Sequence, residues 1–482
     1  MIAKLHSSGS IVLAFGLFCA GIFSFGQVQA PSAQKKAASA ATEAEKDRGE
    51  ILKELEAAQL QFLKEPDRPD LRFKAARLLY QSGDSEKARS LIQPLRDAEK
   101  PSNEILFLAG DLDYLFGDYD RAESSYHKVI GLNAGDLQLQ ARAESKLAMV
   151  FYQTNRYAKA GDLFKGLEGK IRLPHWDLMK AFGQERPYQA VWPGDFGTSI
   201  APFLVSDPLP IISVEVQGRQ IYALIDTGAD LFMLDTEVAA AMGIKPLASM
   251  TGTFAGGKQA EVGFGRVDSL KIGQVTLKAV PISILPTQRF SQGFADGKYT
   301  IGGIVGTGVL RQFLSTMDYP GGQLVLRRAN EEGRKDLRQA MQERAVVEVP
   351  FVLAATHFML ARGSLDGKDR LIFFVDSGLA SEAAFAAPIQ TLKYAGIPVP
   401  ETKVEEGIGG GGGGGFATGL FKITRLGLGP LVQENLKGEY GANPPESYWR
   451  LGFINDGIIS HRFLRQYAWT IDFTKMKMLF TK

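Results

Sequence analysis

The sequence is short of cysteine, histidine and net charge, and each shortage excludes a class of protein. Its 482 residues include one cysteine, Cys19, and five histidines, so neither a disulfide scaffold nor a zinc site is expected. The 55 lysines and arginines nearly balance the 53 aspartates and glutamates, and no basic block is interleaved with aromatic residues. Nucleic acid is therefore not an expected partner. No serine-histidine-aspartate pattern or phosphate loop occurs, and we expect no cofactor and no bound metal.

An apolar run near the N-terminus predicts a secretory signal peptide at residues 1–30. Residues 11–25 form the apolar core, and Val28-Gln29-Ala30 places small residues as signal peptidase prefers. We therefore expect an exported protein, periplasmic or secreted, whose mature chain has no cysteine. Two alternatives stay open, a retained membrane anchor and a lipid on Cys19, although Phe18 is large for a lipoprotein signal. Membrane association is expected only in those two cases.

Residues 51–170 have helical periodicity and a repeated turn, after a polar stretch at 31–50 that predicts a flexible tether. Each turn follows an aromatic residue and precedes an alanine: Gly83-Asp84 with Ala88, Gly117-Asp118 with Ala122, and Asn155-Arg156 with Ala160. The alanines are 34 and 38 residues apart. The pattern resembles a tetratricopeptide array, which implies an all-α helical-repeat solenoid whose turn-preceding aromatic residues fill the gaps between helices. The helices either hold a partner protein or substrate segment, or only pack on the rest of the chain.

The remainder of the chain changes to short β-type runs with glycine turns. We expect residues 171–205, rich in proline and aromatic residues, to be an ordered linker. A charged segment at 330–345 predicts a solvated helix, and it separates two β-rich parts of similar size, 206–329 and 346–482.

The two β-rich parts carry the same motifs in the same order. In each, a turn and an apolar strand lead into Asp226-Thr227-Gly228 or Asp376-Ser377-Gly378. Further along, Ile304-Val305-Gly306 and Ile458-Ile459-Ser460 each begin a segment with leucine-arginine-glutamine-aromatic, followed by apolar-aspartate-aromatic. The separations from Asp226 to Ile304 and from Asp376 to Ile458 are 78 and 82 residues. We infer a duplication, although either tripeptide alone would be read as an Asx-type turn that ends a strand.

A glycine-rich segment lies between these landmarks in both parts. Its members are Phe254, Gly256 and Gly257 in the first part and Ile408, Gly409 and Gly410 in the second. Glycine suits a mobile hairpin tip, and the matching positions make these residues candidates for a substrate-covering flap. A slack loop without a role is the alternative for the run of seven glycines at 409–415.

These residues resemble the pepsin and retropepsin clan of aspartic proteases over roughly residues 205–482. The resemblance implies a closed, bilobal all-β acid-protease fold with two pseudo-symmetric retropepsin-like lobes, each presenting one aspartate, so that no dimer is required. It implies that Asp226 and Asp376 are catalytic and that Thr227 and Ser377 brace one another through backbone hydrogen bonds, with Gly228 and Gly378 keeping the turns tight. Two adjacent carboxyl groups share a proton, so one acts as base toward water and the other as acid toward the peptide carbonyl.

Several positions depart from the family pattern and bear on activity. Ser460 replaces the glycine found at 306, Leu379 replaces a small residue, and Asp230 replaces serine or threonine. His461 is either a packing residue or tunes the acidity of the two aspartates.

The main hypothesis is an aspartic-type endopeptidase acting on exported polypeptides. The alternatives are a catalytically inactive protease-like module that binds a peptide or protein, and a protein that cleaves only itself within residues 171–205.

Overall fold

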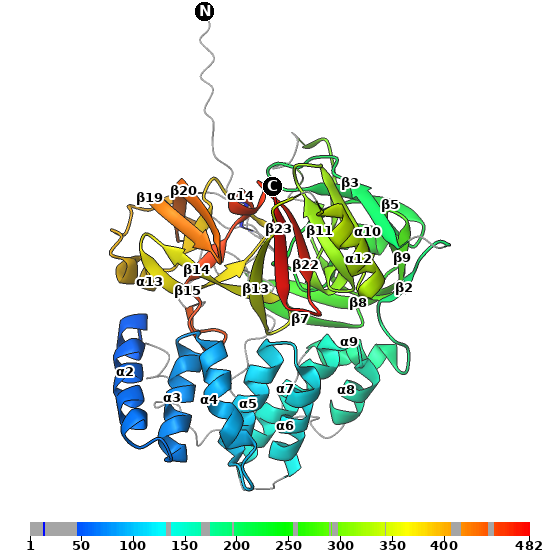
Figure 1. The fold of residues 1–482 in the computed structure, drawn as a ribbon. Coiled ribbons are helices and arrows are strands. Elements are labelled where there is room, and N and C mark those ends of the chain that lie inside the picture. Colours follow the sequence, from blue (N-terminus) through cyan, green and yellow to red (C-terminus); the bar gives the residue numbers. More distant parts are fainter. Residues whose placement is uncertain are drawn as a thin grey trace, which may run out of the picture.

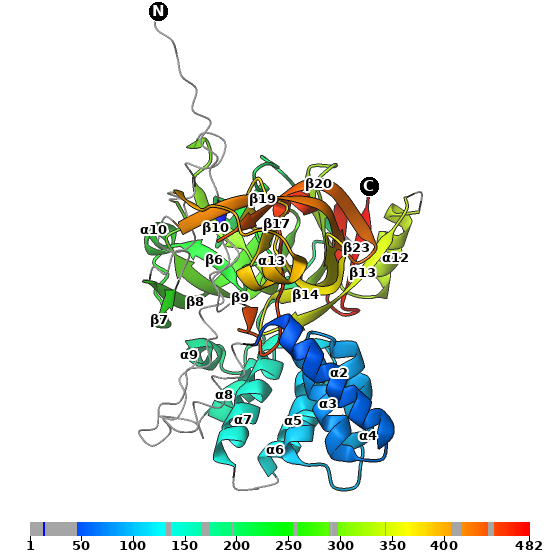
Figure 2. The same cartoon turned by 90° about the vertical axis from the view of Figure 1, so that its left-hand side faces the viewer.

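The computed structural model describes residues 13–14, 46–131, 136–164, 174–194, 197–253, 259–288, 291, 297–342, 344–405, 416–441 and 448–482. The flap candidates Phe254, Gly256, Gly257, Ile408, Gly409 and Gly410 lie outside these residues. A row of helices lies against one side of a β-rich body (Figures 1 and 2). Among the described residues, no helix is both long and apolar enough to cross a membrane.

The helical part consists of α2 to α9, which follow one another side by side (Figure 1). The bounds are α2 Arg48–Lys64, α3 Pro69–Gln81, α4 Ser85–Arg96, α5 Asn103–Leu115, α6 Tyr119–Gly131, α7 Leu137–Gln153, α8 Tyr157–Phe164 and α9 Pro174–Phe182. Helix α2 begins at Arg48, inside the predicted tether, because Asp47 and Glu50 form a capping box. In this box each side chain accepts a hydrogen bond from the backbone amide of the other residue.

The three predicted turns join α3 to α4, α5 to α6 and α7 to α8 with the same geometry. Gly83, Gly117 and Asn155 have φ of 83°, 73° and 57°, a left-handed conformation that glycine and asparagine tolerate best. The alanine after each turn, Ala88, Ala122 or Ala160, is fully buried. Pairs of helices therefore join at all three predicted turns, and the aromatic residue before each turn also contacts the β-rich body, as described below.

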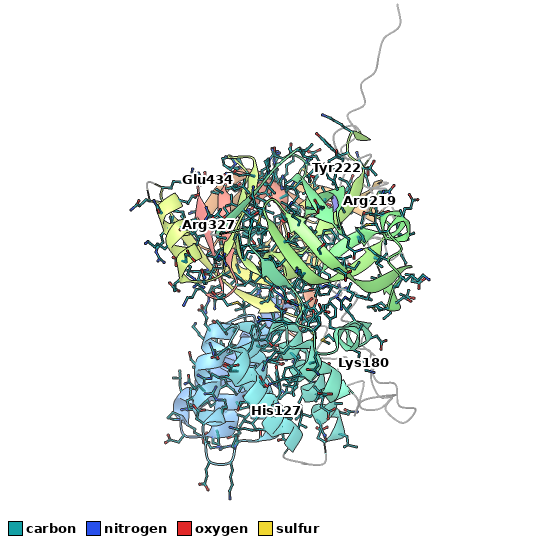
Figure 3. All side chains as sticks on the ribbon, turned by 90° about the vertical axis from the view of Figure 1, so that its right-hand side faces the viewer. His127, Lys180, Arg219, Tyr222, Arg327 and Glu434 are labelled. Atoms are coloured by element: carbon teal, nitrogen blue, oxygen red, sulfur yellow. The ribbon has the colours of Figure 1, made fainter. Side chains whose placement is uncertain are left out.

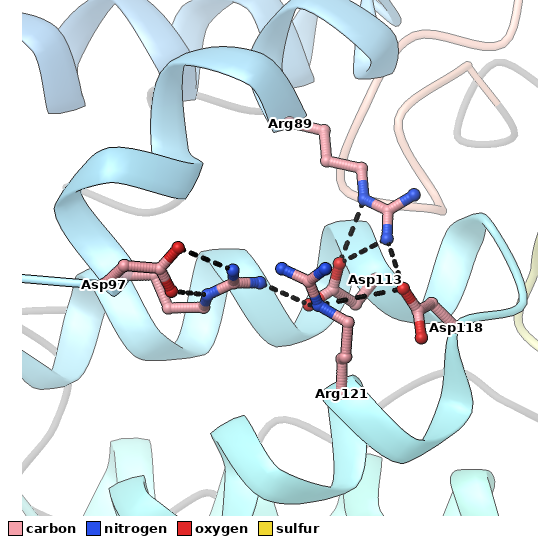
Figure 4. Close-up of polar contacts among 6 residues, drawn as sticks. Arg89, Asp97, Asp113, Asp118 and Arg121 are labelled. Carbon is pink, nitrogen blue, oxygen red and sulfur yellow. Dashed lines mark hydrogen bonds and ion pairs between the residues drawn. The ribbon is translucent and has the colours of Figure 1, made fainter.

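An ion-pair network ties α4, α5 and α6 together (Figure 4). Asp113, 1% exposed, lies at its centre and accepts hydrogen bonds from Arg89 Nε at 3.0 Å and Arg96 Nη1 at 3.1 Å. Arg89 Nη2 also lies 2.6 Å from Asp118, at the start of α6. A buried carboxylate with several guanidinium partners fixes the spacing of successive helices, because leaving that charge unpaired would be costly.

The β-rich body consists mainly of an 8-stranded and a 13-stranded sheet among the described residues. The strands are β2 Gln189–Val191, β3 Thr198–Pro202, β4 Ile211–Val216, β5 Arg219–Ile225, β6 Phe232–Asp235, β7 Ala248–Thr253, β8 Gln259–Ile272, β9 Val275–Leu285, β10 Ile301–Val305, β11 Phe313–Asp318, β12 Gln323–Arg328, β13 Val347–Ala354, β14 Phe358–Leu365, β15 Lys368–Val375, β16 Leu379–Ala380, β17 Phe385–Ala387, β18 Lys403–Glu405, β19 Phe416–Leu428, β20 Leu431–Tyr440, β21 Gly457–Ile459, β22 Ala468–Asp472 and β23 Lys477–Thr481. The short helices are α10 Thr236–Ala241, α11 Thr307–Leu310, α12 Glu331–Ala340, α13 Ile389–Ala395 and α14 His461–Leu464. A strand at Leu13–Ala14, β1, pairs antiparallel with β16.

The same order of strand pairings occurs twice in the β-rich body. In the first part, β5 pairs with β4 and lies parallel to β10, β10 lies antiparallel to β6, and β6 lies parallel to β9. In the second part, β15 pairs with β14 and lies parallel to β21, β21 lies antiparallel to β17, and β17 lies parallel to β20. The duplicated sequence motifs therefore lie in equivalent strands. The predicted charged helix is α12, capped by Asn330.

The two parts join edge to edge through β11 and β22, which pair antiparallel over four residues. The hydroxyls of Thr316 and Thr470 are hydrogen-bonded across this junction at 2.7 Å.

Residues 171–205 are more than the expected linker. They supply α9, and β2 and β3 pair with β9 and β12. The linker covers sheet edges that would otherwise expose unpaired backbone groups.

The apolar core runs without a break from the helices into the β-rich body. One cluster of buried side chains includes Leu112 and Leu147 of the helices together with Phe374 and Ile458 of the body. Figure 3 shows His127 on the helical part, well separated from Arg219 and Tyr222 in the body.

Candidate active site

Asp226 and Asp376 occupy equivalent loops, each directly after a strand of the body. The Asp226 amide donates to the carbonyl of Val305 at 3.0 Å, and the Asp376 amide donates to Ile459 at 3.0 Å. Each Oδ1 accepts an amide from its own turn, Gly228 at 2.6 Å for Asp226 and Gly378 at 2.8 Å for Asp376. The neighbouring parallel strand, β10 for the first loop and β21 for the second, therefore holds each loop by a backbone hydrogen bond. Both carboxyl groups lie where the two parts of the body meet.

Thr227 and Ser377 hold the two loops to each other. The Thr227 amide donates to Ser377 Oγ at 3.0 Å, and the Ser377 amide donates to Thr227 Oγ1 at 2.9 Å. Thr227 Oγ1 in turn donates to the carbonyl of Val375 at 3.0 Å. This reciprocal pair is the mutual bracing that the family resemblance implied, and both side chains are fully buried.

The carboxyl group of Asp226 packs directly against the opposite loop. A Cβ placed on Gly378 would lie 2.1 Å from Cγ and Oδ1 of Asp226. Only glycine therefore fits at this position, which gives the glycine of the motif a role beyond the turn itself. Both aspartates are almost completely inaccessible, at 2% for Asp226 and 0% for Asp376.

The shared burial raises the pKa of both carboxyl groups, but not equally. Burial raises the pKa of Asp226 to about 6, although the amide of Gly228 and a hydrogen bond with Asp376 oppose the rise. Burial, and then the charge of Asp226, raise the pKa of Asp376 well above its usual range. Near neutral pH the pair therefore holds one proton, mainly on Asp376, and one negative charge, mainly on Asp226.

The segment after β10 packs against the first loop, and the segment after β21 lies at the equivalent place in the second part. Thr307 Oγ1 donates to the carbonyl of Thr227 at 2.9 Å. A Cβ on Gly306 would lie 2.3 Å from the carbonyl oxygen of Leu231, so glycine is required there. In the second part the equivalent Ser460 is accommodated: its hydroxyl donates to the carbonyl of Ala383 at 2.5 Å and accepts the amide of Arg462 as the cap of α14. Ser460 therefore does not distort the second loop.

The surroundings of His461 decide between its two interpretations. His461 packs edge-on against Tyr319, with ring centroids 5.1 Å apart, and its Nε2 lies 3.9 Å from Asp207. Burial lowers the pKa of His461 to about 4, so it is neutral at physiological pH. This environment matches the interpretation of His461 as a packing residue. Leu379 is buried in β16 beside the loop.

The helices add residues to the site that the sequence did not indicate. Tyr152, at the end of α7, donates a hydrogen bond to Oδ2 of Asp230 at 3.0 Å. Arg311, at the end of α11, lies over the ring of Tyr152 at 5.2 Å. The repeated aromatic position marked Tyr152 in the sequence, but its partner depends on how the helices dock.

No group of three or more histidine, cysteine, aspartate or glutamate side chains is placed to hold a metal ion in the parts of the chain that the structure describes. Asp226 and Asp376 supply two carboxyl groups that share a proton, and such a pair can act as general base and general acid.

A separate cavity of about 630 Å³ lies between the helices and the β-rich body. Its aromatic walls come from both sides: Phe73, Tyr80, Phe107 and Tyr114 from the helices, and Phe358, Trp449 and Phe453 from the body.

Residues 212–309 match the sequence profile of the aspartyl protease family. The predicted resemblance is confirmed for this stretch, which contains Asp226 but not Asp376. A solved structure similar to part of the chain is a retropepsin-like aspartic protease from Rickettsia conorii, 18% identical, with a match that covers 29% of this chain and 94% of that protein at a TM-score of 0.20. None of the curated proteins matches the sequence.

Proposed function

We propose that this chain, which carries an aspartyl protease sequence at residues 212–309, is an aspartic-type endopeptidase whose Asp226 and Asp376 together activate a water molecule. The observation that carries the proposal is the reciprocal hydrogen bonding of Thr227 and Ser377. It fixes two carboxyl groups from different parts of the chain in one site, with unequal affinities for a proton.

The unequal pKa values assign a role to each aspartate. Asp226, with the lower pKa, is ionised first and accepts a proton from water as the oxygen attacks the peptide carbonyl carbon. Asp376 holds its proton to higher pH and donates it to the carbonyl oxygen. When the tetrahedral intermediate collapses, Asp226 returns its proton to the leaving amine, the carbon–nitrogen bond breaks, and Asp376 takes back the proton of one hydroxyl as the carbonyl bond forms again.

We further propose that the β-rich body is bilobal and pseudo-symmetric, since the same strand pairings recur around both aspartates. A single chain then supplies the complete site without dimerising. The helical part is proposed to be a tetratricopeptide-like solenoid, supported by its three equivalent turns and buried alanines.

An extended polypeptide is the proposed substrate. The edge of β16, three residues after Asp376, pairs antiparallel with the extended segment Leu13–Ala14, and the same backbone groups could pair with a substrate strand. Export to the periplasm or the medium, proposed from the predicted signal peptide, would place the substrates among exported proteins.

The test is cleavage of an unstructured protein by the purified chain and by Asp226→Asn and Asp376→Asn variants. We expect cleavage by the wild type only, with inhibition by a statine-type peptide. Asp318→Asn, at the last residue of β11, is the matched control and should cleave normally. Cleavage that survives both dyad substitutions would overturn the proposal.

A second candidate is a binding module without catalysis, favoured by the aromatic cavity between the helices and the body. It would bind a polypeptide or partner protein there. Tight binding by Asp226→Asn, with no cleavage by the wild type, would favour this candidate. Mass spectrometry of the mature N-terminus and of residues 171–205 separates general proteolysis from self-cleavage alone.

A further inference from the structure

Each repeated turn of the helices presents a tyrosine to the β-rich body. Tyr80, Tyr114 and Tyr152 each lie three residues before the turn residue that has positive φ. Tyr80 packs edge-on against Phe453 with centroids 5.4 Å apart, and Tyr114 donates a hydrogen bond to the carbonyl of Ala355. The helices therefore dock through a repeated sequence position, and the third tyrosine docks at the candidate active site.

Tyr152 contacts the loop that carries Asp226. Its hydroxyl donates to Oδ2 of Asp230, which lies four residues after Asp226 and is 5% exposed. The carbonyl of Asp230 also accepts the amide of Gly308 at 2.6 Å. The loop is thus held by α11 through its backbone and by α7 through its side chain.

Arg311 connects these two supports. It ends α11, and its guanidinium donates to the carbonyl of Tyr152 at 3.3 Å and to Gln153 Oε1. Gln153 Nε2 in turn donates to the carbonyls of Ala355 and Thr356, both at 3.0 Å, in the second part of the body. One helical turn therefore contacts both parts that supply the carboxyl pair.

Among the residues of the second part that the structure describes, the equivalent positions lack this arrangement. Ala380 occupies the position that corresponds to Asp230. Arg465, which corresponds to Arg311, donates to Asp207 instead of to a helix. Asp230 therefore departs from the family pattern at the position that contacts the helices. The physical reason is that its carboxylate accepts the hydrogen bond of Tyr152.

We propose that Tyr152 and Gln153 are positioning residues for the carboxyl pair: Tyr152 holds the Asp226 loop through Asp230, and Gln153 ties α11 to residues 355–356. The helical part is then a component of the active site. The expected effect on kcat rests on the proposed function. The positioning itself is measured by hydrogen exchange at residues 226–231, which requires no catalysis.

Tyr152→Phe removes only the hydroxyl and keeps the ring in place. Tyr126→Phe is the matched control, because Tyr126 is also fully buried and donates to an aspartate, Asp111, at 2.7 Å, but within the helical part. Both variants should lower the melting temperature by similar amounts. Only Tyr152→Phe should lower kcat, by about tenfold with little change in KM, and only it should speed hydrogen exchange at residues 226–231.

The outcomes separate this inference from the proposed function. If the wild type cleaves peptides and the two variants behave alike in kcat and exchange, the positioning role is wrong while the proposed function stands. If the wild type does not cleave, the proposed function fails, and exchange at 226–231 alone decides the inference. Asp230→Ala is a second variant, expected to reproduce the effects of Tyr152→Phe should that protein fail to fold.

Discussion

Arg48 and Asp456, 408 residues apart in the sequence, form a buried bidentate ion pair between α2 and the residue just before β21, the strand that supports Asp376. Arg48 is 4% exposed and Asp456 is fully buried. Asp456 Oδ2 also accepts the amide of Ile372 in β15 at 2.7 Å. The pair therefore joins the start of the helical part to β15, which leads into the second loop, and to the beginning of its parallel neighbour β21.

Arg48→Met should destabilise the protein by about 3–5 kcal/mol, because it leaves the Asp456 carboxylate buried without its partner. The midpoint of urea denaturation measures the effect. Arg68→Met is the control, since Arg68 pairs with Asp70 in solvent, and its midpoint should hardly move. Equal shifts of the urea midpoint for the two variants would contradict the expectation that the buried ion pair matters more for stability than the exposed one.

The contribution of the Asp226 and Asp376 carboxyl groups to the stability of the fold should fall as pH rises from about 4 to 7. Both carboxyl groups of the pair have a folded-state pKa above the unfolded value, so the folded state binds protons more tightly in this range. Asp226→Asn removes this penalty and should be more stable than the wild type at pH 7 by about 1–3 kcal/mol, with the difference vanishing near pH 3.5. Denaturation at several pH values tests this, and a difference that grows toward low pH would contradict it.

Peptide cleavage should have a bell-shaped pH dependence with its rising limb near pH 6. Asp226 must be ionised, and its pKa is about 6, whereas Asp376 must keep its proton. The profile of kcat/KM measures both limbs. An optimum below pH 4 would show that the two carboxyl groups titrate much lower than their burial implies.

Thr227→Ala should lower kcat/KM at least tenfold, because it leaves the buried amide of Ser377 without an acceptor at a cost of about 1–3 kcal/mol. Thr227→Ser keeps the hydroxyl and should retain most of the activity. Kinetics of both variants on one peptide, with thermal melts as the stability reference, distinguish loss of the hydroxyl from loss of the methyl group.

Exchanging the residues at the two equivalent positions 306 and 460 should have unequal effects. Gly306→Ser introduces a Cβ only 2.3 Å from a backbone oxygen and should prevent correct folding. Ser460→Gly loses the cap of α14 and one hydrogen bond, and should cost only about 1–2 kcal/mol. Soluble yield and thermal melts compare the two, and a well-folded Gly306→Ser variant would show that the first loop has more room than its contacts indicate.

The parts of the site that depend on local motifs could be predicted from the sequence. The spacing of the motifs gave the duplication, and the family resemblance gave the pairing of Asp226 with Asp376 and the bracing by Thr227 and Ser377. The left-handed turns at Gly83, Gly117 and Asn155 follow from local backbone preferences, so the positions of these three turns were also predictable.

The contacts that depend on docking could not be predicted. The turn tyrosines pack between helices as expected, Tyr114 against Tyr119 and Tyr152 against Tyr157. Their hydroxyls also donate hydrogen bonds to the β-rich body, and these partners exist only because the helices dock on it. Likewise, residues 198–202 form an edge strand only because β12 offers unpaired backbone groups. The periodicity of one segment predicts its own helix or strand, but it does not predict which distant segment will contact it.

The pairing of β11 with β22 also bears on how the protein is made. The first part of the body leaves the ribosome long before Ala468–Asp472, which must cover its open edge. Until synthesis ends, that edge exposes backbone groups able to pair with other chains. A chaperone that shields β11 during synthesis or export would therefore raise the yield of folded protein, and C-terminal truncation before residue 468 should leave an aggregating product.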